Sequence, residues 1–151
     1  MIIARGAIAA FCLALAPAFA AGPVYPETSR AEADVAAALK EAGRSGKRVL
    51  VDFGGNWCGD CKVLDINLHK PENAALLAKR YLLVHVNVGE KGINDNFALA
   101  ERFGIPLKKG VPALAVLGPG GKVIHSQQGG EFADMRSMDP KSVHDFLVKW
   151  Q

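Results

Sequence analysis

Two cysteines separated by two residues are the part of this sequence most able to do chemistry. Cys58 and Cys61 stand in the run Trp57-Cys58-Gly59-Asp60-Cys61, where a predicted strand turns into a helix. Cysteines at positions i and i+3 share one helical face and are close enough to form a disulfide. The first helical turn has unpaired amides and about half a positive charge, which stabilise a thiolate. We therefore expect a redox pair in which Cys58 is exposed and nucleophilic and Cys61 is shielded and resolving.

Two other interpretations of the cysteine pair are weaker. A zinc site needs about four ligands, and none of the 4 histidines is spaced to form a second ligand pair. A purely structural disulfide stays open, although a loop enclosing only Gly59 and Asp60 would stabilise the fold little. The sequence thus predicts no metal and no organic cofactor, only an external redox partner.

A carboxylate within an apolar strand is the next candidate. Asp52 lies in the run 49–53, which has no clean alternation and suits a central strand covered on both faces. An uncompensated buried carboxylate is costly. We expect Asp52 to be the base that takes the proton of Cys61. The alternative is an aspartate at a strand end that reaches solvent.

A second carboxylate, Asp60, stands between the two cysteines. Its charge is expected to oppose a Cys58 thiolate, and its oxygens to accept from amides of the first helical turn. Both effects raise the pKa of Cys58 and make the disulfide harder to reduce. We therefore expect a reductant or isomerase rather than a strong oxidase.

Composition is that of one ordinary globular domain. The chain has 151 residues, of which 50% are hydrophobic and 22% charged, enough for one core and too few for two. The net charge is only +3, and no run of Lys or Arg exceeds two residues. Nucleic acid is therefore not an expected partner.

The first twenty residues have the pattern of a signal peptide. Arg5 precedes an apolar run, 6–15, that is too short to span a bilayer, and Ala18-Phe19-Ala20 resembles a cleavage site. We expect residues 1–20 to be removed together with Cys12, leaving a domain over 21–151 with no stable membrane insertion. A retained N-terminal anchor is the alternative. Export predicts the periplasm or secretion, where a cysteine pair can be oxidised.

The remaining patterns predict an α/β domain. Helices are expected from a capping box at Ser29–Glu32 to Gly43, from Cys58, from Pro71 to Arg80, from a cap at Asn94 or Asp95 to Gly104, and from Asp139-Pro140 onward. Strands are expected at 49–53, 82–88, 113–117 and 122–127. Helical crossovers imply parallel strands and the last hairpin adds antiparallel ones. The prediction is a central mixed sheet with helices on both faces.

At this point the chain resembles the thioredoxin superfamily. The resemblance is carried by Val51-Asp52-Phe53-Gly54-Gly55-Asn56-Trp57-Cys58-Gly59-Asp60-Cys61-Lys62 and by Gly110-Val111-Pro112-Ala113-Leu114, which is similar to the family's cis-proline loop. The order of the expected helices and strands extends the resemblance over most of the chain after residue 20. Segments 104–109 and 129–134 are more similar to secreted, disulfide-isomerase-like proteins of bacteria than to cytosolic thioredoxin.

The resemblance implies a thioredoxin fold and a role for each residue near the pair. Cys58 would attack, Cys61 would resolve, and Asp52 would be the family's buried acid. Pro112 would be cis and pack against the disulfide, leaving the backbone of Val111 to pair with an extended substrate. The residues implied to bind substrate are Trp57, Val111 and Pro112, and those implied to modulate the pair are Gly59, Asp60 and Lys62.

Three features depart from the superfamily pattern. Asp60 replaces the proline of thioredoxin and the histidine of protein disulfide isomerase. His85 stands where thioredoxin has a lysine near the buried acid. An obvious first strand is missing, and only Val24-Tyr25 offers a short one.

The expected function is that of a periplasmic thiol–disulfide oxidoreductase acting on cysteine-containing exported proteins. One alternative is a dedicated electron carrier for envelope or cytochrome assembly. Another is a copper-handling chaperone that uses the same two sulfurs, although no methionine or histidine ligand motif lies nearby. A third is a binding module with an inert pair, which fast alkylation of Cys58 at neutral pH would exclude.

Overall fold

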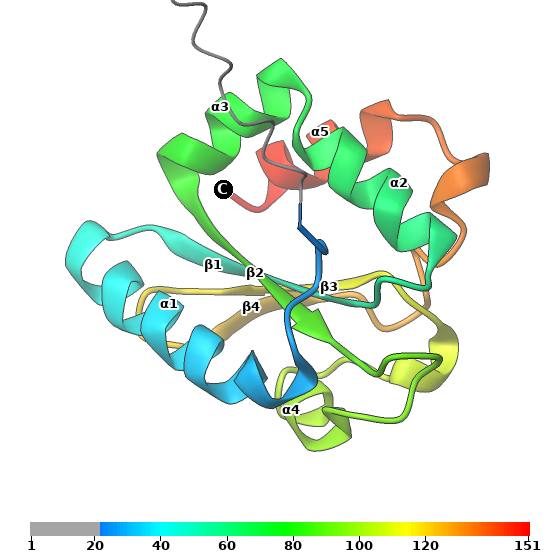
Figure 1. Ribbon diagram of the computed structural model, residues 1–151. Helices are drawn as coiled ribbons and strands as arrows, with labels where there is room; N and C mark the ends of the chain where they lie inside the picture. Colours follow the sequence, from blue (N-terminus) through cyan, green and yellow to red (C-terminus); the bar gives the residue numbers. More distant parts are fainter. Residues whose placement is uncertain (1–21) are drawn as a thin grey trace, which may run out of the picture.

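A mixed sheet forms the centre of the molecule (Figure 1). The computed structural model describes residues 22–151, so the expected signal peptide lies outside the described residues. The strands are β1 (Arg48–Gly54), β2 (Tyr81–Asn87), β3 (Ala113–Leu117) and β4 (Val123–Ser126), in the order β2-β1-β3-β4. Strands β1 and β2 are parallel, whereas β3 is antiparallel to both β1 and β4. The predicted mixed sheet is confirmed.

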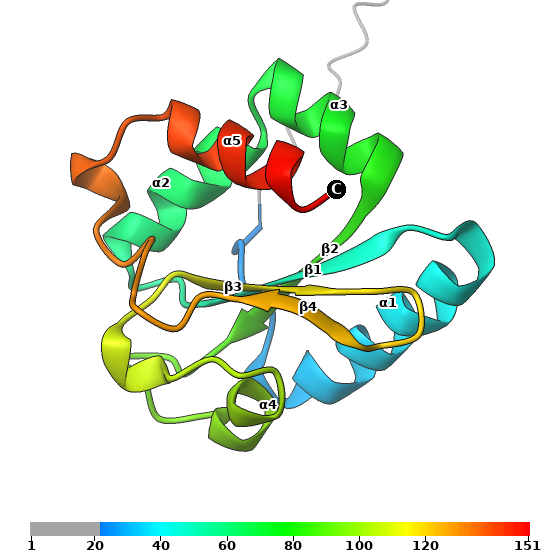
Figure 2. The same cartoon turned by 180° about the vertical axis from the view of Figure 1, so that it is seen from behind.

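Helices cover both faces of the sheet (Figures 1 and 2). On one face lie α1 (Ala31–Ser45) and α4 (Phe97–Arg102), and on the other lie α2 (Gly59–Leu68), α3 (Pro71–Arg80) and α5 (Lys141–Lys149). Short 3-10 turns occur at Thr28–Arg30, Leu107–Lys109 and Met135–Ser137. In the part of the chain from residue 22 onward, no helix is both long and apolar enough to cross a membrane.

Strand β1 is central, as its apolar sequence predicts. Every residue after Arg48 is buried. Because side chains alternate along a strand, Val49, Val51 and Phe53 join the core beneath α1 and α4, whereas Leu50 joins the core beneath α2 and α5. Asp52 shares the face of Leu50 and therefore points toward the layer that contains α2.

The start of α1 differs from the prediction. Ser29 lies within the 3-10 turn, and Arg30 precedes α1 without a side-chain cap. A capping residue needs an extended backbone, which the preceding turn does not allow, so the predicted capping box is wrong. Glu32 instead forms an ion pair with Arg102 of α4 at 2.7 Å, which joins the two helices of this face.

Other element boundaries were predicted with mixed success. Helix α1 continues through Gly43 to Ser45, and Gly46, which follows it, has the left-handed conformation. Neither Asn94 nor Asp95 caps α4, because Asn96 precedes it with its side-chain amide donating to the carbonyls of Thr28 and Asn87. Val24-Tyr25 forms no strand. Pro140 rather than the predicted Asp139 directly precedes α5, although Asp139 Oδ1 accepts from the Lys141 amide at 2.9 Å.

Two glycines provide a matched test of where α1 ends. Apart from the adjacent backbone of α1, no atom of the described residues lies within 4 Å of a Cβ added to Gly43. Gly43→Ala should therefore raise the free energy of unfolding by about 0.5–1 kcal/mol. Gly46 has a φ of +73°, so Gly46→Ala should lower it by about 1 kcal/mol. Urea unfolding of both variants measures the two changes. Stabilisation by both substitutions would contradict the observed end of the helix.

Candidate active site

The two cysteines form a disulfide at the start of α2. Their Cα atoms are 5.2 Å apart. Cys58 is the residue that precedes the helix, and the backbone amide of Cys61 donates to its Sγ at 3.2 Å. Cys61 is fully buried and Cys58 is 6% exposed. Cys61 is shielded as predicted, but the prediction of an exposed Cys58 is wrong, because Cys58 is also buried.

The cis-proline loop covers Cys58. The Val111–Pro112 peptide bond is cis, as the resemblance predicts, and the carbonyl oxygen of Val111 lies 3.6 Å from Cys58 Sγ. Trp57 remains 40% exposed beside the pair, with its indole nitrogen donating to the Gly89 carbonyl at 2.8 Å. The structure therefore brings together the three residues that the resemblance assigns to substrate binding.

Asp52 is fully buried, so the alternative of a solvent-reaching aspartate is wrong. Its Oδ2 accepts from the Tyr25 hydroxyl at 2.7 Å and contacts His85 Nδ1 at 2.9 Å. Its Oδ1 has no hydrogen-bond partner among residues 22–151. Two partners thus compensate the carboxylate at Oδ2, contrary to the expectation of an uncompensated charge. Its Oδ1 can still accept a hydrogen bond.

Tyr25 is a site residue that the sequence did not indicate. It lies on the N-terminal arm, where its backbone N–H donates to Asn56 Oδ1 at 3.0 Å and its carbonyl accepts from Asn56 Nδ2 at 2.8 Å. Burial and the neighbouring Asp52 carboxylate hold the pKa of Tyr25 far above its ordinary value. The hydroxyl therefore stays protonated and donates to Asp52. The arm has no periodic pattern that would have signalled this contact.

His85 reaches Asp52 because the two residues are paired across β1 and β2. Its other ring nitrogen, Nε2, lies 3.7 Å from Asp65 Oδ1 on α2. Burial lowers the pKa of His85, but its hydrogen bond to Asp52 and the charges of Asp52 and Asp65 outweigh burial and raise it overall. The histidine that departs from the superfamily pattern is therefore bound directly to the buried acid.

The prediction that Asp60 carries an uncompensated charge beside Cys58 is wrong. Its Oδ1 accepts from the backbone N–H and Nε of Arg136 at 2.9 and 3.1 Å, and its Oδ2 accepts from Arg136 Nη2 at 3.1 Å. These side-chain hydrogen bonds hold the pKa of Asp60 below its usual value against the effect of burial. Its charge is therefore compensated, and the guanidinium rather than the helical amides is its main partner.

Arg136 also lies close to the residue between Cys58 and Asp60. A Cβ added to Gly59 would be 3.6 Å from Arg136 Nη1. The arginine follows Asp60 by 76 positions, and no local pattern links the two. Lys62, the remaining residue expected to modulate the pair, is exposed on α2.

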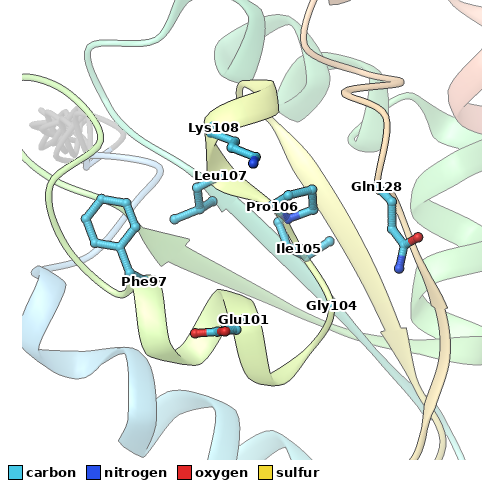
Figure 3. Close-up of a pocket in the computed structure, with 8 residues that line it drawn as sticks. All are labelled: Phe97, Glu101, Gly104, Ile105, Pro106, Leu107, Lys108 and Gln128. Atoms are coloured by element: carbon cyan, nitrogen blue, oxygen red, sulfur yellow. The ribbon is translucent and has the colours of Figure 1, made fainter.

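An open cavity of about 600 Å³ lies next to the segment that leads into the cis-proline loop. Figure 3 shows Phe97 of α4 on one side of it and Ile105, Pro106 and Leu107 facing it. Phe97 is 53% exposed. Neither cysteine lines this cavity, so it is separate from the thiol chemistry. Within residues 22–151, no group of three or more Cys, His, Asp or Glu side chains is placed to hold a metal ion.

Comparison with known proteins agrees with this geometry. Residues 30–119 match the model of a family described as thioredoxin-like. The chain belongs to the thioredoxin-like family. It is also 32% identical over 109 residues to the thiol:disulfide interchange protein DsbD 1 of Pseudomonas aeruginosa. That match covers 69% of this chain but only 16% of the Pseudomonas protein.

Two solved structures are also similar to this chain in their fold. A disulphide isomerase from Xylella fastidiosa Temecula1 has a TM-score of 0.79 and 37% identity, covering 86% of this chain and 98% of that protein. The reduced C-terminal domain of Neisseria meningitidis DsbD has a TM-score of 0.56 and 20% identity, covering 80% and 96% respectively, and supports the fold alone. Family, fold and disulfide together show a thioredoxin-like domain in which Cys58 and Cys61 form a closely spaced, oxidised pair.

Removing the charges of Asp60 and Arg136 one at a time tests whether they cancel at Cys58. Asp60→Asn leaves the guanidinium uncompensated and should lower the pKa of Cys58 in the reduced protein, whereas Arg136→Gln should raise it. Alkylation at pH 6 should change by about three- to tenfold in opposite directions. Iodoacetamide labelling from pH 5 to 9 provides the measurement.

The double variant Asp60→Asn/Arg136→Gln is the matched control. Because it removes both charges, its labelling profile should return close to that of the wild type. A double variant that differs from the wild type as much as either single variant would contradict cancellation of the charges.

Proposed function

We propose that this protein works in the periplasm, where it reduces or isomerises disulfides of exported proteins through its Cys-Gly-Asp-Cys pair. The observation that carries the proposal is the disulfide at the start of α2, where the Cys61 amide already donates to Cys58 Sγ. A Cys58 thiolate would keep this hydrogen bond and gain from the helix terminus. The likeness to the Xylella disulphide isomerase, over 98% of its length, favours isomerisation.

The exchange begins from the reduced pair. The Cys58 thiolate attacks one sulfur of a substrate disulfide, that S–S bond breaks, and the other substrate sulfur leaves as a thiolate. Cys61 then loses its proton and attacks Cys58, which forms the enzyme disulfide and releases the first substrate sulfur as a thiolate. A dithiol partner reduces the enzyme again by the same two steps. In isomerisation, a substrate thiolate instead attacks the mixed disulfide, so the pair ends reduced.

Three neighbours of Cys58 are proposed to hold the substrate. The cis-proline loop places Val111 against Cys58, so an extended substrate segment that pairs with the Val111 backbone would bring its sulfur to the attacking thiolate. Pro112 would shape this ledge. Trp57 is the exposed aromatic side chain at its border, and 40% of it is open to solvent.

Asp52 is proposed as the base for the resolving step. Cys61 is fully buried, so its proton has no direct exit to water. Asp52 points to the layer of α2, and its Oδ1 makes no hydrogen bond to any described residue. This oxygen is therefore available to accept the Cys61 proton.

A dedicated electron carrier is the second candidate. It is favoured by the 32% identity to the Pseudomonas thiol:disulfide interchange protein. A carrier would exchange rapidly with a few partner proteins and would not correct mispaired cysteines. Reactivation of a scrambled disulfide protein by the reduced chain separates the two candidates, because only an isomerase restores native pairing.

The two cysteines should behave differently when replaced. Cys61→Ala should accumulate mixed disulfides with exported proteins, because Cys58 attacks but nothing resolves the product. In Cys58→Ala the rate of exchange should fall by at least about 100-fold, since the remaining thiol, that of Cys61, is buried and lacks the helix-terminal amide. Non-reducing gels of periplasmic extracts, with the double alanine variant as control, provide the measurement. Trapping by Cys58→Ala but not by Cys61→Ala would contradict the assignment.

A further inference from the structure

A line of titratable side chains leads from the buried acid to the surface. His85 Nδ1 lies 2.9 Å from Asp52 Oδ2, and His85 Nε2 lies 3.7 Å from Asp65 Oδ1. Asp65 Oδ1 in turn lies 3.2 Å from His69 Nδ1. The exposed fractions of the four side chains, from Asp52 outward, are 0%, 17%, 20% and 64%. The line thus begins in the core and ends in solvent.

We propose that His85 carries the Cys61 proton from Asp52 to the surface by way of Asp65. This inference rests on the proposed role of Asp52 as the base for Cys61. His85 does not touch either sulfur, so it is a proton-relay residue that acts through Asp52 rather than a catalytic residue.

The relay is balanced as a series of proton transfers. Cys61 gives its proton to the free Oδ1 of Asp52, and the resulting thiolate attacks Cys58 of the mixed disulfide. Rotation of the Asp52 carboxyl group then brings this proton beside His85. The proton passes to Nδ1 of neutral His85, and His85 releases the proton on its Nε2 toward Asp65. The separation of 3.7 Å between Nε2 and Asp65 Oδ1 is one that a single water molecule or a small side-chain movement bridges. One proton has then reached solvent and the Asp52 carboxylate is restored, and exchange of the His85 ring proton with solvent returns it from Nδ1 to Nε2 for the next cycle.

The other partner of Asp52 cannot take this role. Tyr25 also contacts Asp52 Oδ2, but its raised pKa keeps the hydroxyl protonated. It is buried in the core and so offers no way out. Among the described residues that contact the Asp52 carboxylate, His85 alone both accepts a proton and reaches toward solvent.

The charged groups around His85 are acidic. Asp52 and Asp65 face its two nitrogens, Tyr25 packs edge-on against its ring with centroids 5.1 Å apart, and Asp34 and Glu41 of α1 share with it a surface hollow of about 360 Å³. This surrounding favours protonated His85, which cannot accept from Asp52. Resolution should therefore slow as pH falls through the pKa of His85. The hollow also gives a small base access to this position.

A two-step aromatic disulfide separates attack from resolution in one experiment. When the reduced protein meets 5,5′-dithiobis(2-nitrobenzoate), one thionitrobenzoate is released as Cys58 attacks and a second as Cys61 resolves. Stopped-flow absorbance follows both phases. The variants are Asp52→Asn, His85→Asn, which keeps an amide near the Nδ1 position, and His85→Ala, which leaves a space. His144→Asn, which alters a histidine on α5 that binds Asn73 instead, is the matched control.

The relay predicts that His85→Asn slows the second phase at least about tenfold at pH 7, with the first phase changed less than about twofold. The pH dependence near neutrality in the wild type should be lost in this variant. Added imidazole should restore the second phase of His85→Ala in proportion to its neutral form. The His144→Asn control should match the wild type in both phases, and imidazole should not accelerate it.

The other outcomes overturn the relay in distinguishable ways. If Asp52→Asn slows resolution but His85→Asn does not, the base stands and the relay is wrong. If neither variant slows resolution, the proposed role of Asp52 fails and the relay fails with it. If His85→Ala is slow and imidazole restores nothing, His85 has only a structural role. If the wild type shows no first phase, the proposed thiol–disulfide exchange itself is wrong.

Discussion

The site depends on a carboxylate that the fold places inside its own core. Strand β1 is buried on both faces because it is central in the sheet, yet it carries Asp52 with no exposure to solvent. An ion in such a place requires partners. The arm supplies Tyr25 and the neighbouring strand supplies His85, which explains why the residues before α1 are fastened to the turn at Asn56.

The same strand also determines where the sulfurs lie. It ends in a short turn that places Cys58 at the start of α2, with one helical amide on its sulfur and the cis-proline loop above it. Asp60 would place a negative charge beside this sulfur, but Arg136 from a distant segment binds both of its oxygens. The local field at Cys58 is therefore that of a helix terminus and a paired charge, not of a lone carboxylate.

The local parts of this site could be predicted from the sequence, whereas its long-range pairs could not. The cysteine spacing, the apolar strand and the turn between them are all encoded within 49–61, and the cis bond before Pro112 followed from the family resemblance. The contact between Asp52 and His85 depends on the register of two parallel strands, and that between Asp60 and Arg136 spans 76 positions. Neither contact leaves a local pattern in the sequence. For this reason Asp52 and Asp60 were expected to be lone charges, whereas the structure gives each of them a partner.

The central claim is that Cys58 and Cys61 form a reversible redox pair poised to reduce or isomerise disulfides. Equilibration of the protein with glutathione buffers, read from the fraction of free thiols, tests it most directly. The proposed reduction or isomerisation of disulfides predicts reversible exchange with a potential between about −270 and −180 mV, the range of thioredoxin and disulfide isomerase. A potential near the value of about −120 mV of a strong oxidase, or a pair that does not exchange, would contradict the account.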